Sequence, residues 1–155
     1  MRRNLFFAVL VFWAWAGVAG ALDWKPLHEK ADQGDPQVLL AQANREPRSA
    51  QALYAAALAC LDLYRVVEAE VFFQRMLSVD PGSVEARWGL VEINRRRHQL
   101  GQGESVLREI LQKAPDYAPA YITLAYILFD KEDYDQAIAW AQRVLRAGSH
   151  RVDRV

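Results

Sequence analysis

The sequence predicts an all-α fold in which helix-turn-helix units are stacked one after another. Residues of the same kind recur every 34 positions, as Ala52, Ala86 and Ala120 do. Apolar residues within each unit are spaced as on one face of a helix. No segment alternates apolar and polar residues with a period of two, so we expect no strands. The predicted units, which join without insertions, are 50–83, 84–117 and 118–151.

Length and composition limit the classes of function. The 155 residues suggest one domain, and 52% hydrophobic with 25% charged residues excludes a disordered chain. The 19 basic residues are balanced by 19 acidic ones, so a nucleic-acid partner is not expected. One cysteine excludes a disulfide framework and a cysteine-based zinc site, and the three histidines form no short metal-binding motif. We therefore expect no metal and no cofactor.

The first 21 residues have the pattern of a secretory signal peptide. Arg2 and Arg3 precede an apolar run from Leu5 to Ala21, which ends in Ala19-Gly20-Ala21. A basic start, an apolar centre and small residues before the cleavage site are typical of such a signal. We expect cleavage after Ala21, which predicts a periplasmic or secreted protein.

An uncleaved membrane anchor is the alternative for this segment. Residues 5–21 are at the lower limit of the length that crosses a bilayer. They would then hold the protein at the inner membrane, facing the periplasm, and a membrane contact is expected only in that case. Trp13 and Trp15 lie in the middle of the run, where membrane helices seldom place tryptophan, and this favours cleavage.

Residues 22–49 predict a short helical extension or a degenerate repeat. Trp24 to Ala31 is consistent with one short helix. Asp35 before Pro36 suggests an N-cap followed by proline at the first helical position. This segment would cover the first unit.

Each of the three units predicts two helices. In the third unit Tyr121, Leu124, Ala125 and Leu128 follow the i, i+3, i+4, i+7 spacing of one helix face. A second apolar stripe begins at Ala137, after the polar segment KEDYD. Proline ends the second helix of the first two units, because the residue before proline disfavours helical geometry.

The 34-residue unit resembles the tetratricopeptide repeat. The segment AYITLAYILFDKEDYDQAIAWAQRVL is similar to a typical unit of that family, with Tyr134 and Ala137 at matching positions. The resemblance implies a right-handed superhelix that binds other proteins and is not catalytic. The second unit departs from the pattern, because Gly103 replaces the usual alanine and His98 the usual turn glycine. We expect its turn to be reshaped.

The resemblance also implies a concave groove lined by the first helix of each unit. The side chains expected to bind a partner there are Tyr54, Leu58, Trp88, Glu92, Arg95, Arg96, Ile122, Tyr126 and Phe129. Contiguous apolar surface of this kind usually marks an interaction site. The alternative is that some of these residues pack under the N-terminal segment or between helices.

The end of the array offers a second candidate surface. Repeat arrays usually finish with a helix whose outer face is polar. Here only GSHRVDRV follows the last predicted helix, with a tail at 152–155, so Ile138, Ala141 and Leu145 are expected to be uncapped. This end is expected to pack against another copy, as a homodimer, or against another protein.

Three other features have simpler explanations. Arg95 to His98 form a basic cluster at a predicted helix end, where the helix dipole favours positive charge; an anchor for an acidic partner is the alternative. Asp130 to Asp135 lacks the glycine and the closing glutamate of a calcium loop, so a turn is expected. Cys60 lies within an apolar stripe and is expected to be a buried thiol.

No catalytic arrangement of residues is apparent, so we do not expect an enzyme. The sequence therefore predicts an exported, non-catalytic scaffold that binds a peptide or helix of an envelope protein in its apolar groove. A structural oligomerisation module that uses the uncapped end, or an accessory subunit of an envelope enzyme, is the alternative.

Overall fold

A computed structural model describes residues 23–149, with the side chains resolved as far as Val144. The predicted signal peptide at 1–21, its cleavage site after Ala21 and the tail at 152–155 lie outside the described residues. So does the side chain of Leu145. Among the described residues, no helix combines the length and the apolar character needed to cross a membrane.

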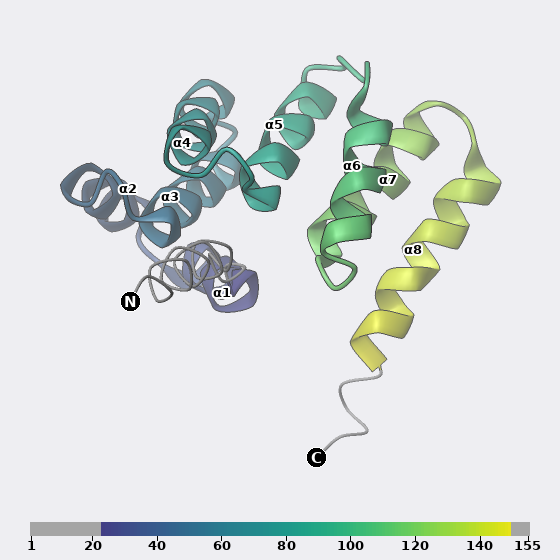
Figure 1. The fold of residues 1–155 in the computed structure, drawn as a ribbon, viewed down its shortest axis with the longest axis horizontal. Helices are drawn as coiled ribbons and strands as arrows, with labels where there is room; N and C mark the ends of the chain where they lie inside the picture. The colour runs from purple at the N-terminus through teal and green to yellow at the C-terminus, as the bar shows by residue number, and fades with distance from the viewer. Residues whose placement is uncertain (1–22, 150–155) are drawn as a thin grey trace, which may run out of the picture.

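The described chain is entirely helical, without strands, and the predicted all-α fold of stacked hairpins is confirmed (Figure 1). Its helices are α1 (Trp24–Gln33), α2 (Pro36–Arg45), α3 (Ala50–Asp62), α4 (Val66–Val79), α5 (Val84–Arg96), α6 (Gly103–Lys113), α7 (Ala118–Asp130) and α8 (Tyr134–Ser149). Three hairpins, α3–α4, α5–α6 and α7–α8, follow one another along an arc. Each hairpin packs against the first helix of the next, α4 against α5 and α6 against α7, while α1 and α2 both pack on α3.

Short polar side chains set the starts of several helices. The Ser49 hydroxyl accepts a hydrogen bond from the backbone N–H of Ala52 at 3.3 Å, and Ser83 does the same for Ala86 at 3.2 Å. Asp35 caps α2, as the sequence predicts, by accepting from the N–H of Gln37 at 2.8 Å. These caps satisfy N–H groups that have no partner inside the helix.

The turns inside the three hairpins share one backbone conformation. Tyr64, His98 and Glu132, which are 34 residues apart, have φ angles of 56°, 57° and 65°. Residues other than glycine seldom adopt this left-handed backbone conformation. The second turn is also longer, because α6 begins only at Gly103, so the expected reshaping of this turn is observed.

The hairpins approach each other closely at one glycine. A side-chain carbon placed on Gly89 of α5 would lie 2.2 Å from the ring of Phe73 on α4. Phe73 is fully buried, and Gly89 therefore sets the distance between the first and second hairpins.

Candidate functional site

Helix α1 lies over the N-terminal half of the predicted groove. Trp24 and His28 extend from α1 into an aromatic cluster with Tyr54, Trp88 and Tyr117. The ring of Trp24 meets that of Tyr117 edge-on at 5.7 Å, and Trp88 meets Tyr117 at 5.9 Å. Edge-to-face pairs of this kind stabilise beyond their buried area.

A chain of hydrogen bonds runs through this cluster. The Nε2 atom of His28 is 2.9 Å from the Tyr54 hydroxyl, which is 2.7 Å from the hydroxyl of Tyr117. Burial raises the pKa of both tyrosines, so they stay neutral. Burial also lowers the pKa of His28, although the nearby charge of Asp32 acts in the opposite direction. The neutral chain fixes α1 to α3 and to the start of α7.

Three of the predicted groove residues are consequently covered. Tyr54, Leu58 and Trp88 have exposed fractions of only 0%, 5% and 6%. The structure thus corrects the expectation of an open aromatic trough through these positions, and the alternative of packing under the N-terminal segment applies to them. The sequence predicted a short helix from Trp24 to Ala31, but not the surface that it covers.

A buried carboxylate organises the middle of the predicted groove. Glu92, 6% exposed, accepts hydrogen bonds from Arg95 at 2.8 and 2.9 Å, from Arg96 at 2.9 Å and from the hydroxyl of Thr123 at 3.1 Å. The indole N–H of Trp88 donates to the same hydroxyl at 2.9 Å. Burial alone would raise the pKa of Glu92, but the two guanidinium groups outweigh it and lower that pKa. Glu92 is therefore charged, and its hydrogen bond from Thr123 links α5 to α7.

Arginines of the basic cluster form contacts with other residues of the chain. Arg96 also donates to the carbonyl of Leu61 at 2.6 Å, and Arg97 pairs with Glu70 of the preceding hairpin at 2.8 Å. These contacts give Arg96 and Arg97 a structural role in stacking the hairpins, while Arg95 pairs with Glu92 in its own helix.

A pocket of about 440 Å³ lies between α1, α3, α5 and α7. Most of the predicted groove residues line it, so the structure does bring them together around one space. The groove residues among its lining are Leu58, Trp88, Glu92, Arg95, Arg96, Ile122 and Tyr126. Its wall is largely charged near α5 and apolar near α7.

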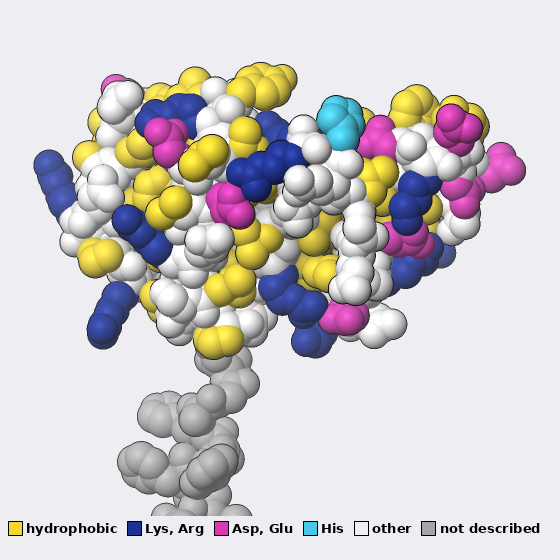
Figure 2. All heavy atoms as spheres, turned by 90° about the horizontal axis from the view of Figure 1, so that it is seen from above, with side chains coloured by type: hydrophobic (Ala, Val, Ile, Leu, Met, Phe, Trp, Pro, Cys, Tyr) yellow, Lys and Arg dark blue, Asp and Glu magenta, His cyan; other side chains and the backbone are white. Residues whose placement is uncertain are grey.

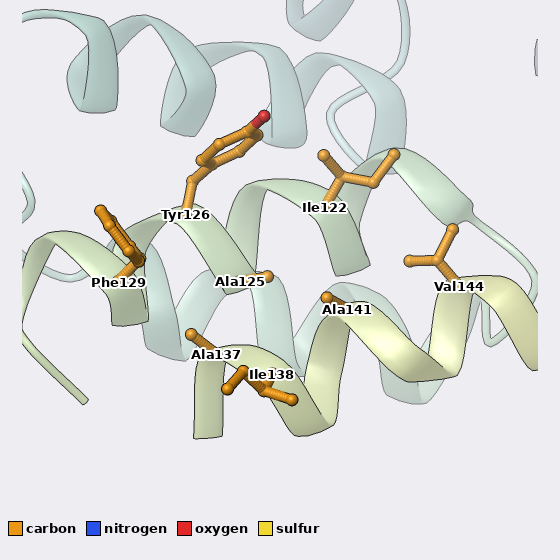
Figure 3. Close-up of a pocket in the computed structure, with 8 residues that line it drawn as sticks. All are labelled: Ile122, Ala125, Tyr126, Phe129, Ala137, Ile138, Ala141 and Val144. Atoms are coloured by element: carbon orange, nitrogen blue, oxygen red, sulfur yellow. The ribbon is translucent and has the colours of Figure 1, made fainter. Parts of the chain in front are cut away.

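The C-terminal part of the predicted groove is open and apolar. A second pocket, of about 520 Å³, lies between α7 and α8 and has only apolar and aromatic lining residues (Figure 3). Those residues are Ile122, Ala125, Tyr126, Phe129, Ala137, Ile138, Ala141 and Val144. Four large side chains remain about half exposed: Ile122 at 45%, Tyr126 at 53%, Ile138 at 57% and Phe129 at 58%. We call this surface the α7/α8 groove.

The two surfaces predicted separately from the sequence therefore meet. Phe129 was expected in the concave groove and Ile138 and Ala141 at the uncapped end, yet all three line the α7/α8 groove. Ile122 and Tyr126 line both pockets and connect them. Sequence reasoning missed Val144, which follows Ala137 and Ala141 along the same helix face.

The remaining candidate features have structural roles. Cys60 is buried, and burial raises the pKa of its thiol. Residues 131–133 form the turn before α8, and the Asp133 carboxylate accepts from the N–H of Gln136 at 3.2 Å. Over residues 23–149, no group of three His, Cys, Asp or Glu side chains could hold a metal ion. Figure 2 shows basic and acidic side chains interspersed, without a basic patch on the face that it presents.

Solved structures of similar fold carry the name MamA. One, described as the crystal structure of MamA, superposes with a TM-score of 0.59 at 16% identity and covers 94% of this chain and 86% of its own. A second, described as MamA RS-1 ArsTM double mutant, gives 0.56 at 21% identity and covers 79% of this chain and 71% of its own. No curated protein matches the sequence. At these identities the likeness shows the fold alone.

A family model agrees with the interpretation of the repeats. The model described as tetratricopeptide repeat matches residues 95–154, which include the turn of the second hairpin, α6, α7 and α8. The 34-residue spacing extends the same unit back to residue 50. The prediction of tetratricopeptide repeats is confirmed: residues 95–154 match the tetratricopeptide repeat model, and the hairpin before them has the same helix-turn-helix arrangement.

Proposed function

We propose that this protein is an exported, non-catalytic scaffold that binds another protein in the α7/α8 groove. The observation that carries the proposal is the continuous apolar lining of that groove, with four large side chains about half exposed. Apolar patches of this kind on a folded protein usually mark contact surfaces. The fold supports the same conclusion, because tetratricopeptide repeats are typically interaction modules without catalytic residues.

The groove is better suited to binding than the aromatic cluster under α1. Trp88 and Tyr54 are buried and hydrogen-bonded, so substituting them would disturb the fold as well as any binding. Phe129 projects from the end of α7 and is 58% exposed, so substituting it leaves the core intact.

Site-specific photo-crosslinking in the native cell tests this proposal. A photoreactive amino acid at Phe129 should yield one recurrent band that contains a foreign protein. The same probe at Gln112, an exposed residue of α6 outside both pockets, is the control and should not yield that band. Equal crosslinking from both positions, or none from Phe129, would contradict binding in the α7/α8 groove.

The export part of the proposal rests on the basic, apolar and small residues at 1–21. Cleavage after Ala21 predicts that the mature protein begins at Leu22, which amino-terminal sequencing or intact mass of the native protein would show. A native protein that still begins with residues 1–21 and sediments with membranes would instead support the anchor.

A further inference from the structure

We infer that the occupant of the α7/α8 groove is an amphipathic α-helix of a partner protein, with an aliphatic side chain facing Ile138. This inference rests on the proposed function and specifies the partner's chemistry. It follows from how helices of the chain fill the grooves of the first and second hairpins. It follows also from two positions at which the α7/α8 groove differs from those grooves.

The first two hairpins each hold a helix where the third has its open groove. Helix α5 packs into the groove formed by α3 and α4, and α7 packs into that formed by α5 and α6. In those grooves the residues equivalent to Ala141 are Phe73 and Leu107, and those equivalent to Val144 are Met76 and Ile110. All four are buried under the entering helix. The α7/α8 groove continues the same series. Its geometry therefore suits a helix rather than an extended peptide.

An ion pair recurs between successive hairpins. Arg97, just after α5, pairs with Glu70 at 2.8 Å, and Lys131, just after α7, pairs with Glu104 at 2.8 Å. Both partners advance by 34 residues from one pair to the next. The next acceptor position is 138, where the chain has isoleucine, 57% exposed. A helix with a basic residue there would place its charge against a hydrocarbon side chain, so an aliphatic residue fits better.

The size of the groove residues changes as well. Ala141 occupies the position that Phe73 holds in the first hairpin, where the facing residue is Gly89. A smaller residue in the groove leaves room for a larger one on the helix that enters it. The occupant is thus expected to carry a large aliphatic side chain where α5 carries glycine.

The ion pairs also give the direction of the occupant. Arg97 and Lys131 follow the C-terminal ends of their helices, while Glu70 and Glu104 lie near the starts of α4 and α6. The C-terminal end of the bound helix therefore lies over Ile138, near the start of α8.

Two peptides derived from this chain can test the inference. Both carry the sequence of residues 83–98 with Gly89→Leu. They differ only at position 97: the arginine peptide keeps Arg97, and the leucine peptide carries Arg97→Leu. Leucine at position 89 also hinders entry into the α3/α4 groove, because a side chain there would collide with Phe73. Binding of each labelled peptide is measured by fluorescence anisotropy, against the wild-type protein and against Ile138→Glu.

The Ile138→Glu variant is a matched receptor for this experiment. Glutamate occupies the equivalent positions 70 and 104, and Ile138 is exposed, so the helix should keep its fold; circular dichroism and thermal unfolding check this. We expect the leucine peptide to bind the wild type roughly fivefold more tightly than the arginine peptide does. We expect the order to reverse on Ile138→Glu, where Arg97 of the peptide regains a carboxylate.

Three results would overturn the inference: the same order of affinity on both receptors, no binding of the leucine peptide to the wild type, or a wild-type homodimer that Ile138→Glu dissociates in sedimentation. The last would identify a second copy as the occupant. Crosslinking from Phe129 to a partner, together with an unchanged peptide order, would leave the proposed function standing and reject only the aliphatic helix. Absence of the crosslink from Phe129, together with an unchanged peptide order, would reject both the proposed function and the aliphatic helix.

Discussion

At the scale of single residues, the contact between Gly89 and Phe73 gives a direct test of the packing. Alanine normally favours a helix over glycine by about 1 kcal/mol. Here its methyl group would lie 2.2 Å from the buried Phe73 ring, and overpacking of that kind costs roughly 1–3 kcal/mol. Gly89→Ala is expected to lower the free energy of unfolding in a urea titration. Combining it with Phe73→Leu should cost less than the sum of the two single changes, whereas simple additivity would contradict the predicted collision.

Single residues also show how much of the site the sequence could predict. Ile122, Tyr126 and Phe129 were expected on a binding face from the resemblance to the tetratricopeptide repeat, and they do line one groove. The same resemblance placed Trp88 on that face, yet Trp88 is buried, because its exposure depends on α1, which lies far away in the sequence. A periodic pattern identifies the face of a helix, but not which distant segment covers that face.

At the scale of elements, the attachment of α1 should depend on pH. Burial lowers the pKa of His28 below its ordinary value of 6.5, although Asp32 opposes the shift. As the pH falls through about 6.5, the unfolded chain binds this proton before the folded one does, so the free energy of unfolding decreases. The decrease levels off once the pH is below the folded-state pKa.

Urea titrations between about pH 7.5 and 5 measure this effect. The wild type should lose more stability over that range than His28→Gln, which lacks the titrating group. The exposed residue Gln112 of α6, which does not titrate, is the control, and Gln112→Ala should keep the slope of the wild type. Identical slopes for the wild type and His28→Gln would contradict a role for His28 in holding α1.

The turn elements carry local strain that can be removed. Glu132 has a φ of 65°, in the left-handed region, which costs a residue other than glycine about 1 kcal/mol. Because Glu132 is exposed, Glu132→Gly should raise the free energy of unfolding by roughly 0.5–1 kcal/mol. Glu132→Ala should give no such gain, since alanine keeps the steric conflict. A thermal melt in which both variants shift alike would contradict the explanation.

The turns also show why the family pattern predicted the fold better than the details. The typical turn glycine is replaced in the second unit by His98, and the expected reshaping is observed as a later start of α6. However, His98 keeps the left-handed conformation that glycine would favour. Tyr64 and Glu132 have the same conformation at the equivalent positions of the other two turns, so the residue type alone does not reveal it.

At the scale of the whole molecule, the stacked hairpins make stability uneven along the chain. In such arrays each unit contacts only its neighbours, so a unit with one neighbour opens more easily than one with two. Helix α3 packs against α1, α2 and α4, whereas the packing of α8 is mainly against α7. The pairs Arg97–Glu70 and Lys131–Glu104 tie successive hairpins, and no equivalent pair extends from Ile138 within the described chain. The α7/α8 hairpin is therefore the part of the array that gains most from a bound partner.

Native-state hydrogen exchange can test this consequence across the molecule. Amide protons of α8 are expected to exchange with a lower free energy of opening than those of α3 and α4. A helix bound in the α7/α8 groove should stabilise α8, by about 2.7 kcal/mol at a free concentration of 100 times the dissociation constant. The leucine peptide should therefore raise protection in α8 of the wild type while leaving α3 nearly unchanged. Ile138→Glu should lose much of this gain at the same peptide concentration. Equal protection of α8 and α3 in the free protein would contradict the uneven stability, and protection that rises only in α3 and α4 would place the peptide in another groove.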